Sequence, residues 1–174
     1  SRYCDGFNYQ ETEVRFKDND FSFRPVSGGC VIEFGIEPDT KIYGFGLQLY
    51  RFDEYGNKIT VRCNADAPRA TGDSHAAVPF FVTNKGYGMY FDTARYAEFY
   101  LGRQKPGSVT SSTPFTPLTS EAELYAARRS DSRELISVFI PYAKGIDIYV
   151  TEGKTVTDMV AEYNMLAGGG CEVP

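Results

Sequence analysis

The side chains that could carry out covalent or metal chemistry in this chain are 23 acidic residues, one histidine and four cysteines. Two carboxyl groups on either side of a glycosidic bond can hydrolyse it, one as an acid and the other as a base or nucleophile. The acidic residues are spread along the chain, and their spacing does not select such a pair. Most of them are expected on solvated faces.

The single histidine, His75, gives little support for nucleophilic catalysis. A serine or cysteine nucleophile needs a base oriented beside it. No serine in the sequence lies in a G-x-S-x-G motif. A lone histidine in a polar loop is more often a surface residue than a catalyst, so no catalytic residue is assigned.

The four cysteines occur singly rather than as C-x-x-C pairs. They are Cys4, Cys30, Cys63 and Cys171. Zinc binding needs clustered ligands, and one histidine with distant thiols does not supply them, so no metal site is expected. One or two disulfides could form in an oxidising compartment, and four unpaired thiols are the favoured alternative. The compartment itself stays open.

Two G-x-G fragments, Gly44-Phe45-Gly46 and Gly86-Tyr87-Gly88, invite comparison with phosphate-binding loops. Neither opens a helix after a parallel strand, as such a loop requires. Tight turns or glycines beneath aromatic rings are therefore expected, and no cofactor is expected.

The aromatic side chains allow two interpretations. The 13 tyrosines and 13 phenylalanines could pack against the C–H faces of sugars, or they could fill the core of a β-sandwich. Core packing is favoured for any single ring. The tyrosines near turns or strand ends are the ones expected to be exposed: Tyr50, Tyr55, Tyr87 and Tyr96.

Charge and hydropathy exclude two classes of partner. A net charge of −5 opposes binding to a phosphate backbone, so no nucleic acid is expected. The longest apolar stretch, Ala76 to Val82, is too short to cross a bilayer and contains Pro79, so no membrane partner is expected.

Short alternating segments between turn residues must position these side chains, and about ten of them predict an all-β antiparallel sandwich. The expected strands are Glu13–Lys17, Phe21–Val26, Val31–Phe34, Leu47–Phe52, Ile59–Cys63, Pro79–Thr83, Gly88–Phe91, Tyr96–Leu101, Ala122–Arg128, Glu134–Ile140 and Ile146–Thr151. Turn residues predict two hairpins, one around Asp53–Asn57 and the other around Asn84–Gly86.

Two segments depart from the strand pattern. Residues 103–118 are rich in serine, threonine, proline and glycine and predict a long exposed loop. A helix is predicted over Val156–Ala167, with Thr155 as N-cap, Asp158 in the first turn and glycines from Gly168 onward to end it. Its apolar face consists of Val156, Met159, Val160, Tyr163 and Leu166.

Three motifs taken in order resemble the N-terminal β-sandwich domain of glycoside hydrolase family 31, which includes α-glucosidases and α-xylosidases. The segment Ile42–Gly46 resembles its "YGFG" strand, and Val78–Asp92 resembles the following "PFF-x-S/T-x-x-GYG" hairpin. The segment Tyr163–Gly168 is similar to the "Y-x-x-L-T-G" ending that leads into the catalytic barrel. The resemblance covers roughly 41–174 and implies a galactose-mutarotase-like sandwich.

The resemblance also implies that the chain has two parts. Residues 1–153 would form the sandwich, and residues 154–174 a connector helix and linker toward a catalytic (β/α)8 barrel of the same parent chain. The family's nucleophile motif contains tryptophan, and this chain has none. The fragment is therefore expected to be inactive, and weak self-association is expected if it exposes the surface that normally contacts the barrel.

One family role can be transferred to residues of this sequence. In the family, the loop between the YGFG strand and the PFF hairpin reaches over the barrel mouth, and its aspartate near a proline binds the outer sugar. Asp66, followed by Ala67-Pro68, resembles that aspartate; Asp73, Arg69 and His75 are further candidates for binding carbohydrate. A carboxylate can accept hydrogen bonds from two vicinal hydroxyls.

Two other functions are alternatives to a domain of such a hydrolase. One is a stand-alone carbohydrate-binding module with an aromatic platform, and the other is a structural or adhesion sandwich without a ligand.

Overall fold

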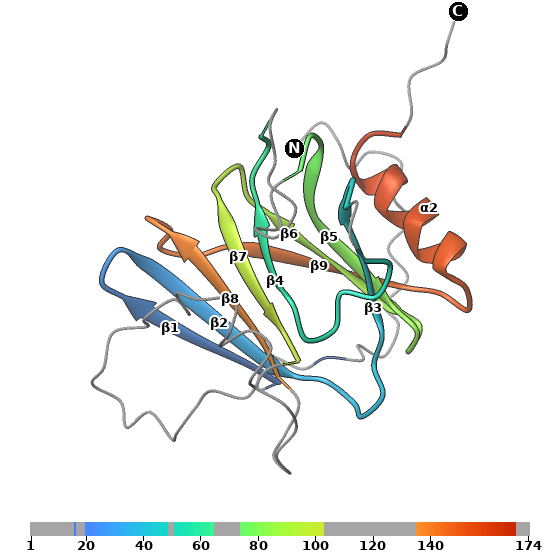
Figure 1. The fold of residues 1–174 in the computed structure, drawn as a ribbon, viewed down its shortest axis with the longest axis horizontal. Coiled ribbons are helices and arrows are strands. Elements are labelled where there is room, and N and C mark those ends of the chain that lie inside the picture. Colours follow the sequence, from blue (N-terminus) through green and yellow to red (C-terminus); the bar gives the residue numbers. More distant parts are fainter. Residues whose placement is uncertain (1–15, 17–19, 49–50, 65–73, 103–134, 170–174) are drawn as a thin grey trace, which may run out of the picture.

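Two antiparallel sheets pack face to face, and one helix lies outside them (Figure 1). This computed structural model describes residues 16, 20–48, 51–64, 74–102 and 135–169. The five-stranded sheet has the order β1-β2-β8-β7-β4, and the four-stranded sheet has the order β3-β5-β6-β9. The elements are β1 (Phe21–Val26), β2 (Gly29–Gly35), β3 (Ile42–Gly46), β4 (Lys58–Val61), β5 (Ala77–Thr83), β6 (Tyr87–Asp92), β7 (Ala97–Leu101), β8 (Leu135–Pro141), β9 (Asp147–Glu152) and α2 (Val156–Leu166). The predicted all-β sandwich is confirmed.

Aromatic rings from both sheets form the core between them. Phe45 packs against Phe99 with ring centroids 4.9 Å apart, and Phe91 meets Phe99 edge-on at 5.0 Å. The largest fully buried aromatic side chains are Tyr87, Phe34, Phe45, Phe81, Phe91 and Phe99. For the five phenylalanines the prediction of core packing is confirmed, because each lies on the inward face of its strand.

The expected exposure of tyrosines was right in part. Tyr96 is 62% exposed, as predicted, and Tyr55 is half-buried. Tyr87 was wrongly expected to be exposed: it is 2% exposed, because strand alternation places it with Met89 on the core side of β6. Tyr50 lies outside the described residues.

The hairpin around Asn84–Gly86 is confirmed as the β5–β6 pair, with Phe81 opposite Met89. Gly86 adopts φ +80°, which favours glycine. Thr83 Oγ1 donates to the Tyr87 carbonyl at 2.8 Å and thereby closes the turn from inside.

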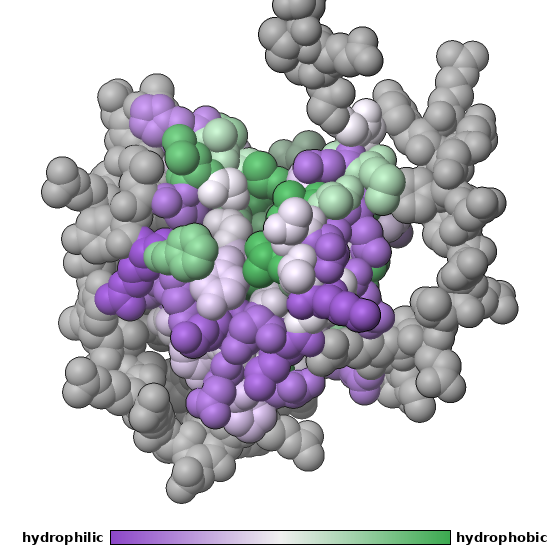
Figure 2. Space-filling model, turned by 90° about the vertical axis from the view of Figure 1, so that its right-hand side faces the viewer, coloured by the Kyte–Doolittle hydropathy of each residue, from purple (hydrophilic) through white to green (hydrophobic). Residues whose placement is uncertain are grey.

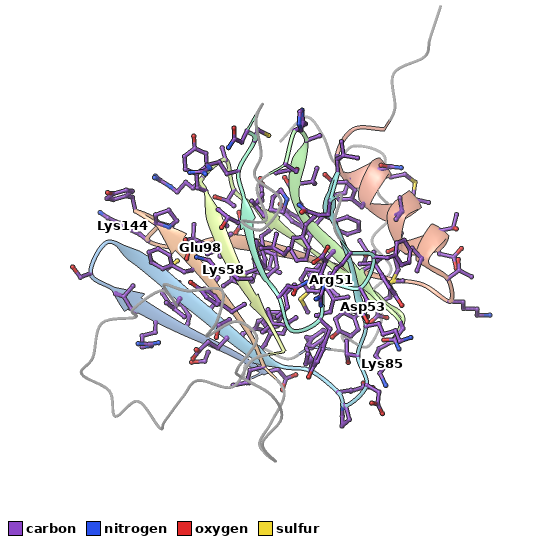
Figure 3. The ribbon with its side chains drawn as sticks, viewed as in Figure 1. Arg51, Asp53, Lys58, Lys85, Glu98 and Lys144 are labelled. Carbon is purple, nitrogen blue, oxygen red and sulfur yellow. The ribbon has the colours of Figure 1, made fainter. Side chains whose placement is uncertain are left out.

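The hairpin predicted around Asp53–Asn57 is wrong. The strand preceding this segment is β3, which ends at Gly46, and the described residues of Leu47–Phe52 are not in a strand. The strand following it, β4, pairs with β7 in the other sheet, where Lys58 Nζ lies 3.0 Å from Glu98 Oε1 (Figure 3). The segment therefore crosses from one sheet to the other instead of reversing within one.

Hydrogen bonds to both sheets hold this crossing. Asp53 Oδ1 accepts from the backbone N–H of Ile42 at 3.1 Å, and the Glu54 N–H donates to the Ile42 carbonyl at 2.8 Å. On the other side, the Gly56 N–H donates to the Leu101 carbonyl at 2.8 Å. The segment does contain turn residues, but these long-range hydrogen bonds determine which sheet the next strand joins.

The predicted helix and its N-cap are confirmed. Thr155 Oγ1 accepts from the Asp158 N–H at 3.2 Å, and Asp158 Oδ2 accepts from the Thr155 N–H at 2.9 Å, which completes a capping box. Met159 is 1% exposed against β5, and the Tyr163 ring stacks on Phe80 with centroids 4.1 Å apart. Met159, Val160 and Tyr163 of the predicted apolar face therefore pack on the outer side of the four-stranded sheet, whereas Val156, assigned to the same face, is 44% exposed.

Several predictions fall wholly or mostly on residues that the structure does not describe. They are the strands at 13–17 and 122–128 and the loop at 103–118. The boundary between residues 153 and 154 stays a prediction. Cys30 is buried and Cys63 is exposed, both as free thiols, and burial raises the pKa of the Cys30 thiol. No helix among the described residues has the length and hydropathy to cross a membrane.

Candidate functional site

The structure places one of the four predicted carbohydrate-binding residues. His75 lies in the turn just before β5 and is exposed to solvent. Asp66, Arg69 and Asp73 lie outside the described residues. The two ends of the loop that carries them are described, and they show how the fold presents it.

The loop begins and ends at neighbouring points. Cys63 and Ser74 form an isolated parallel bridge. The Asn64 N–H donates to the Ser74 carbonyl at 2.9 Å, and the Ser74 N–H donates to the Arg62 carbonyl at 3.1 Å. Ser74 is 3% exposed, and its hydroxyl has no hydrogen-bond partner among the described residues. The base of the loop is therefore fixed by backbone bonds.

The end of β3 lies against this base. The Leu47 N–H donates to the Ala76 carbonyl at 3.0 Å, and Gly46 pairs with Ala77 after a shift of register. Gly46 adopts φ +80°, and a Cβ at this position would lie 1.9 Å from the Ala76 carbonyl oxygen. A glycine is therefore required where the YGFG segment meets the returning loop.

A bulge in β3 turns Phe45 into the core. Phe45 has φ 62°, an uncommon conformation for a bulky residue, and is 0% exposed. Its ring stacks on Phe81 at 5.5 Å, while Gln48 Nε2 donates to its carbonyl at 3.1 Å. The first G-x-G fragment thus shapes a β-bulge beneath an aromatic core, as expected, rather than a phosphate loop.

The buried carboxyl group of Glu54 is explained by its bond within the segment that crosses between the two sheets. Glu54 is 4% exposed, and Oε2 accepts from Asn57 Nδ2 at 2.9 Å. Burial raises its pKa, while the bond from Asn57 acts in the opposite direction. Figure 3 shows the neighbouring Arg51 and Asp53 close together in this crossing. Among the described residues, no cluster of three or more histidine, cysteine or acidic side chains could hold a metal ion.

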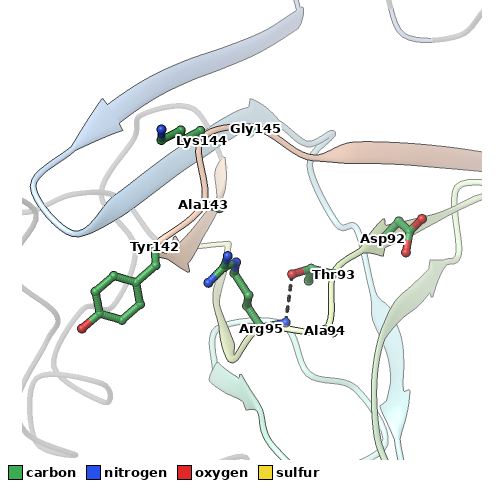
Figure 4. A pocket seen from close by; sticks show the side chains of 8 residues that line it. All are labelled: Asp92, Thr93, Ala94, Arg95, Tyr142, Ala143, Lys144 and Gly145. Atoms are coloured by element: carbon green, nitrogen blue, oxygen red, sulfur yellow. Dashed lines mark hydrogen bonds between the residues drawn. The ribbon is translucent and has the colours of Figure 1, made fainter.

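An open hollow of about 660 Å³ lies between the β6–β7 and β8–β9 connections (Figure 4). Its lining residues are Asp92, Thr93, Ala94, Arg95, Tyr142, Ala143, Lys144 and Gly145. Sequence analysis did not identify it, because neither connection carries a motif and some 50 residues separate them.

Comparison with known proteins points to one group of enzymes. No family model matches the chain. Over 75 residues, 43% of its length, the chain is 28% identical to the α-xylosidase XylQ from Lactiplantibacillus pentosus, of which it covers 10%. The chain therefore corresponds to a small part of that enzyme.

Solved structures share its fold. A cycloalternan-degrading enzyme from Trueperella pyogenes in complex with isomaltose matches 94% of this chain with a TM-score of 0.60 and 17% identity, over 21% of its own chain. A family 31 dextranase from Flavobacterium johnsoniae complexed with glucose matches 86% with a TM-score of 0.56 and 16% identity, over 15% of its chain. A family 31 α-xylosidase from a soil metagenome, complexed with xylose, matches 84% with a TM-score of 0.54 and 17% identity, over 17% of its chain.

These matches define the class of protein by its fold: a β-sandwich of the kind found within family 31 glycoside hydrolases. The chain resembles the N-terminal sandwich domain of that family, as its motifs predicted. It spans about a tenth to a fifth of the length of these relatives.

Proposed function

We propose that this chain is the non-catalytic N-terminal domain of a family 31 glycoside hydrolase of the α-glucosidase or α-xylosidase type. It packs on the catalytic barrel of the same parent protein and supplies residues 64–75 to the outer substrate subsite. The observation that carries this proposal is the loop base: Asn64 and Ser74 are bonded to each other next to the end of β3. The end of the YGFG segment and the two described ends of the loop are therefore bonded side by side.

Apolar surface supports packing against a further domain. On the side of the molecule that carries α2, hydrophobic side chains gather in the upper part and hydrophilic ones lie below (Figure 2). Phe52 is 84% exposed and contacts the half-buried ring of Tyr43 at 4.9 Å, and Leu47 is 51% exposed beside the loop base. Exposed apolar groups of this size commonly mark interaction surfaces.

The helix supports the proposed path of the chain. α2 is anchored to the sandwich through Met159 and Tyr163, while Val156 is 44% and Met165 58% exposed. A helix fixed on one side, with two exposed apolar side chains elsewhere on its surface, suits a connector between two bodies. Residues 154–174 would then lead from the sandwich toward the barrel.

Within this arrangement Asp66 accepts hydrogen bonds from sugar hydroxyls, and Asp73, Arg69 and His75 are the other candidates on the loop. Their role is to position the sugar and exclude water rather than to break a bond. The catalytic carboxyl groups belong to the barrel.

The test is steady-state kinetics of the full-length parent enzyme with the disaccharides isoprimeverose, maltose and isomaltose, each of which places a sugar in the outer subsite. Because a hydrogen bond to a charged group contributes about 1.5–3 kcal/mol, Asp66→Asn should lower kcat/KM roughly 10- to 100-fold. Asp73→Asn on the same loop is the matched comparison and should have the smaller effect. The present chain alone should show no turnover, and hydrolysis by it would overturn the assignment.

The alternative, a stand-alone carbohydrate-binding module, needs no barrel. Exposed rings such as Tyr96 and Tyr142 are the observation in its favour. Calorimetric titration of the chain separates the two functions, since a module acting alone should bind oligosaccharides with sub-millimolar affinity.

A further inference from the structure

The hollow between the β6–β7 and β8–β9 connections is open to solvent and has a volume of about 660 Å³. In Figure 4, Tyr142 stands at one side of the hollow and Asp92 at the other, with the Arg95 side chain between them. Lys144 lies far from the crossing that contains Arg51 and Asp53 (Figure 3).

Tyr142 is held in an unfavourable backbone conformation while its ring is exposed. It has φ 56°, which costs an L-residue about 1–2 kcal/mol, and it is 79% exposed. Its N–H donates to the Gly28 carbonyl at 2.7 Å, which ties the β8–β9 connection to the β1–β2 turn. Strained residues of this kind cluster at binding and active sites, because folding alone does not favour them.

Tyr90, on the outer face of the four-stranded sheet, contacts the Asp92 side chain. Tyr90 Oη donates to Asp92 Oδ1 at 3.3 Å. Burial and the nearby Asp92 carboxylate raise the pKa of Tyr90 to about 12, so the phenol stays a donor at neutral pH. The Asp92 carboxylate therefore lies beside Tyr90 on the outer face of the sheet, at one end of the hollow.

The balance of charge selects the kind of ligand. Arg95 and Lys144 supply donors, and Asp92 supplies acceptors, with Asp147 directly opposite Asp92 across the β6–β9 pair. The lining thus holds one carboxylate and two cations, with the Asp147 position next to Asp92 in the sheet, so it offers both acceptors and donors of hydrogen bonds. A neutral molecule with many hydroxyls can use both the donors and the acceptors.

We propose that this hollow binds a neutral oligosaccharide, with the Tyr142 ring against one sugar face, Asp92 accepting from hydroxyls, and Arg95 and Lys144 donating to sugar oxygens. The inference goes beyond the proposed function, because it uses no residue of the loop at 64–75 and needs no barrel. It describes a second carbohydrate site on the sandwich itself.

The test is titration of the chain with isomaltotriose, maltotriose and xylotriose, followed by amide chemical shifts and by calorimetry. An open hollow of this kind should bind at least one of them with a Kd on the order of 10 mM, weaker than the sub-millimolar affinity expected of a stand-alone module. The amides of Ala94, Arg95 and Gly145 should shift. Tyr142→Gly should weaken binding at least fivefold without lowering the melting temperature, because glycine tolerates φ 56°.

Two further variants keep the test independent of folding. Asp92→Asn retains the shape of the side chain and should also weaken binding at least fivefold. Phe23→Ala, which removes a 49% exposed ring from β1, is the matched control and should leave the Kd unchanged.

Three results would overturn the proposal: no saturable binding of any of the three trisaccharides, an unchanged Kd in Tyr142→Gly and Asp92→Asn, or tighter binding of inorganic phosphate at the hollow. None of them would affect the proposed function, which depends on the kinetics of Asp66→Asn in the parent enzyme.

Discussion

Phe45 and Tyr142 share a left-handed backbone but differ in what surrounds their rings. Their φ angles are 62° and 56°, whereas their exposed fractions are 0% and 79%. Burying a phenylalanine stabilises the fold by about 1.5–3 kcal/mol, enough to offset a backbone cost of about 1–2 kcal/mol. Burial thus explains the conformation of Phe45. Tyr142 lacks this burial: its backbone is held by the bond to Gly28, and its exposed ring is left for the proposed sugar site.

The largest effect on stability is expected when the buried ring of Phe45 is removed. Phe45→Ala should lower the free energy of unfolding by about 3–5 kcal/mol, because it leaves a cavity between Phe81 and Phe99. Tyr142→Ala, the exposed counterpart, should change it by less than about 0.5 kcal/mol. Urea denaturation of both variants measures the difference, and equal losses would contradict this explanation.

A comparison of alanine substitutions at two glycines tests how closely the loop base is packed. Gly46 and Gly56 have similar φ angles of +80° and +82°, but a Cβ meets the Ala76 carbonyl at Gly46 and open space at Gly56. Gly46→Ala should cost about 3 kcal/mol or more, and Gly56→Ala about 1 kcal/mol. Thermal denaturation compares them directly. Similar melting temperatures of the two variants would show that the loop base shifts readily to accommodate a Cβ at position 46.

A smaller effect is expected when the strain at Tyr142 is relieved. Tyr142→Gly removes the steric cost of the left-handed conformation but raises the entropy of the unfolded chain. The free energy of unfolding should stay the same or rise by up to about 1 kcal/mol. A clear loss in denaturant titration would mean that the ring contributes to folding, and the contrast with Phe45 would disappear.

The smallest effect concerns Tyr90 beside the hollow, and it appears at high pH. Burial and Asp92 raise its pKa in the folded state to about 12, above the ordinary value of 10. The folded state therefore holds this proton more tightly, and its contribution to stability, complete below pH 10, is lost as the pH rises toward 12. Between pH 10 and 11 the native protein should lose stability more steeply than Tyr90→Phe. Parallel pH profiles of the two proteins would contradict this.

Features fixed by neighbours in sequence were predictable. The capping box of Thr155 and Asp158 and the turn at Gly86 each depend on groups within four residues. The same reasoning failed at Asp53–Asn57, because turn residues indicate a change of direction and not the sheet that the next strand joins. Bonds to Ile42 and Leu101 decide that, and they span 12 and 45 residues.

The sites were less predictable than the fold. Asp66, Asp73, Arg69 and His75 came from a resemblance, and of these the structure describes His75 alone. The hollow depends on Arg95 and Tyr142 reaching the same place from two connections. Neither has a neighbour in sequence that signals the other, so the sheet topology had to be known first.

The bridge between Cys63 and Ser74 has a consequence for how domains of this kind can diversify. The atoms that clamp this stem belong to the main chain of Arg62, Asn64 and Ser74, so they do not dictate the side chains in between. Loop-closure entropy rises slowly with length, by about 0.6 kcal/mol for each doubling. An exchange of residues 65–73 therefore leaves the bonded groups of the stem unchanged, and under the proposed function, grafting an insert from a relative onto this stem should alter the sugar preference of the parent enzyme.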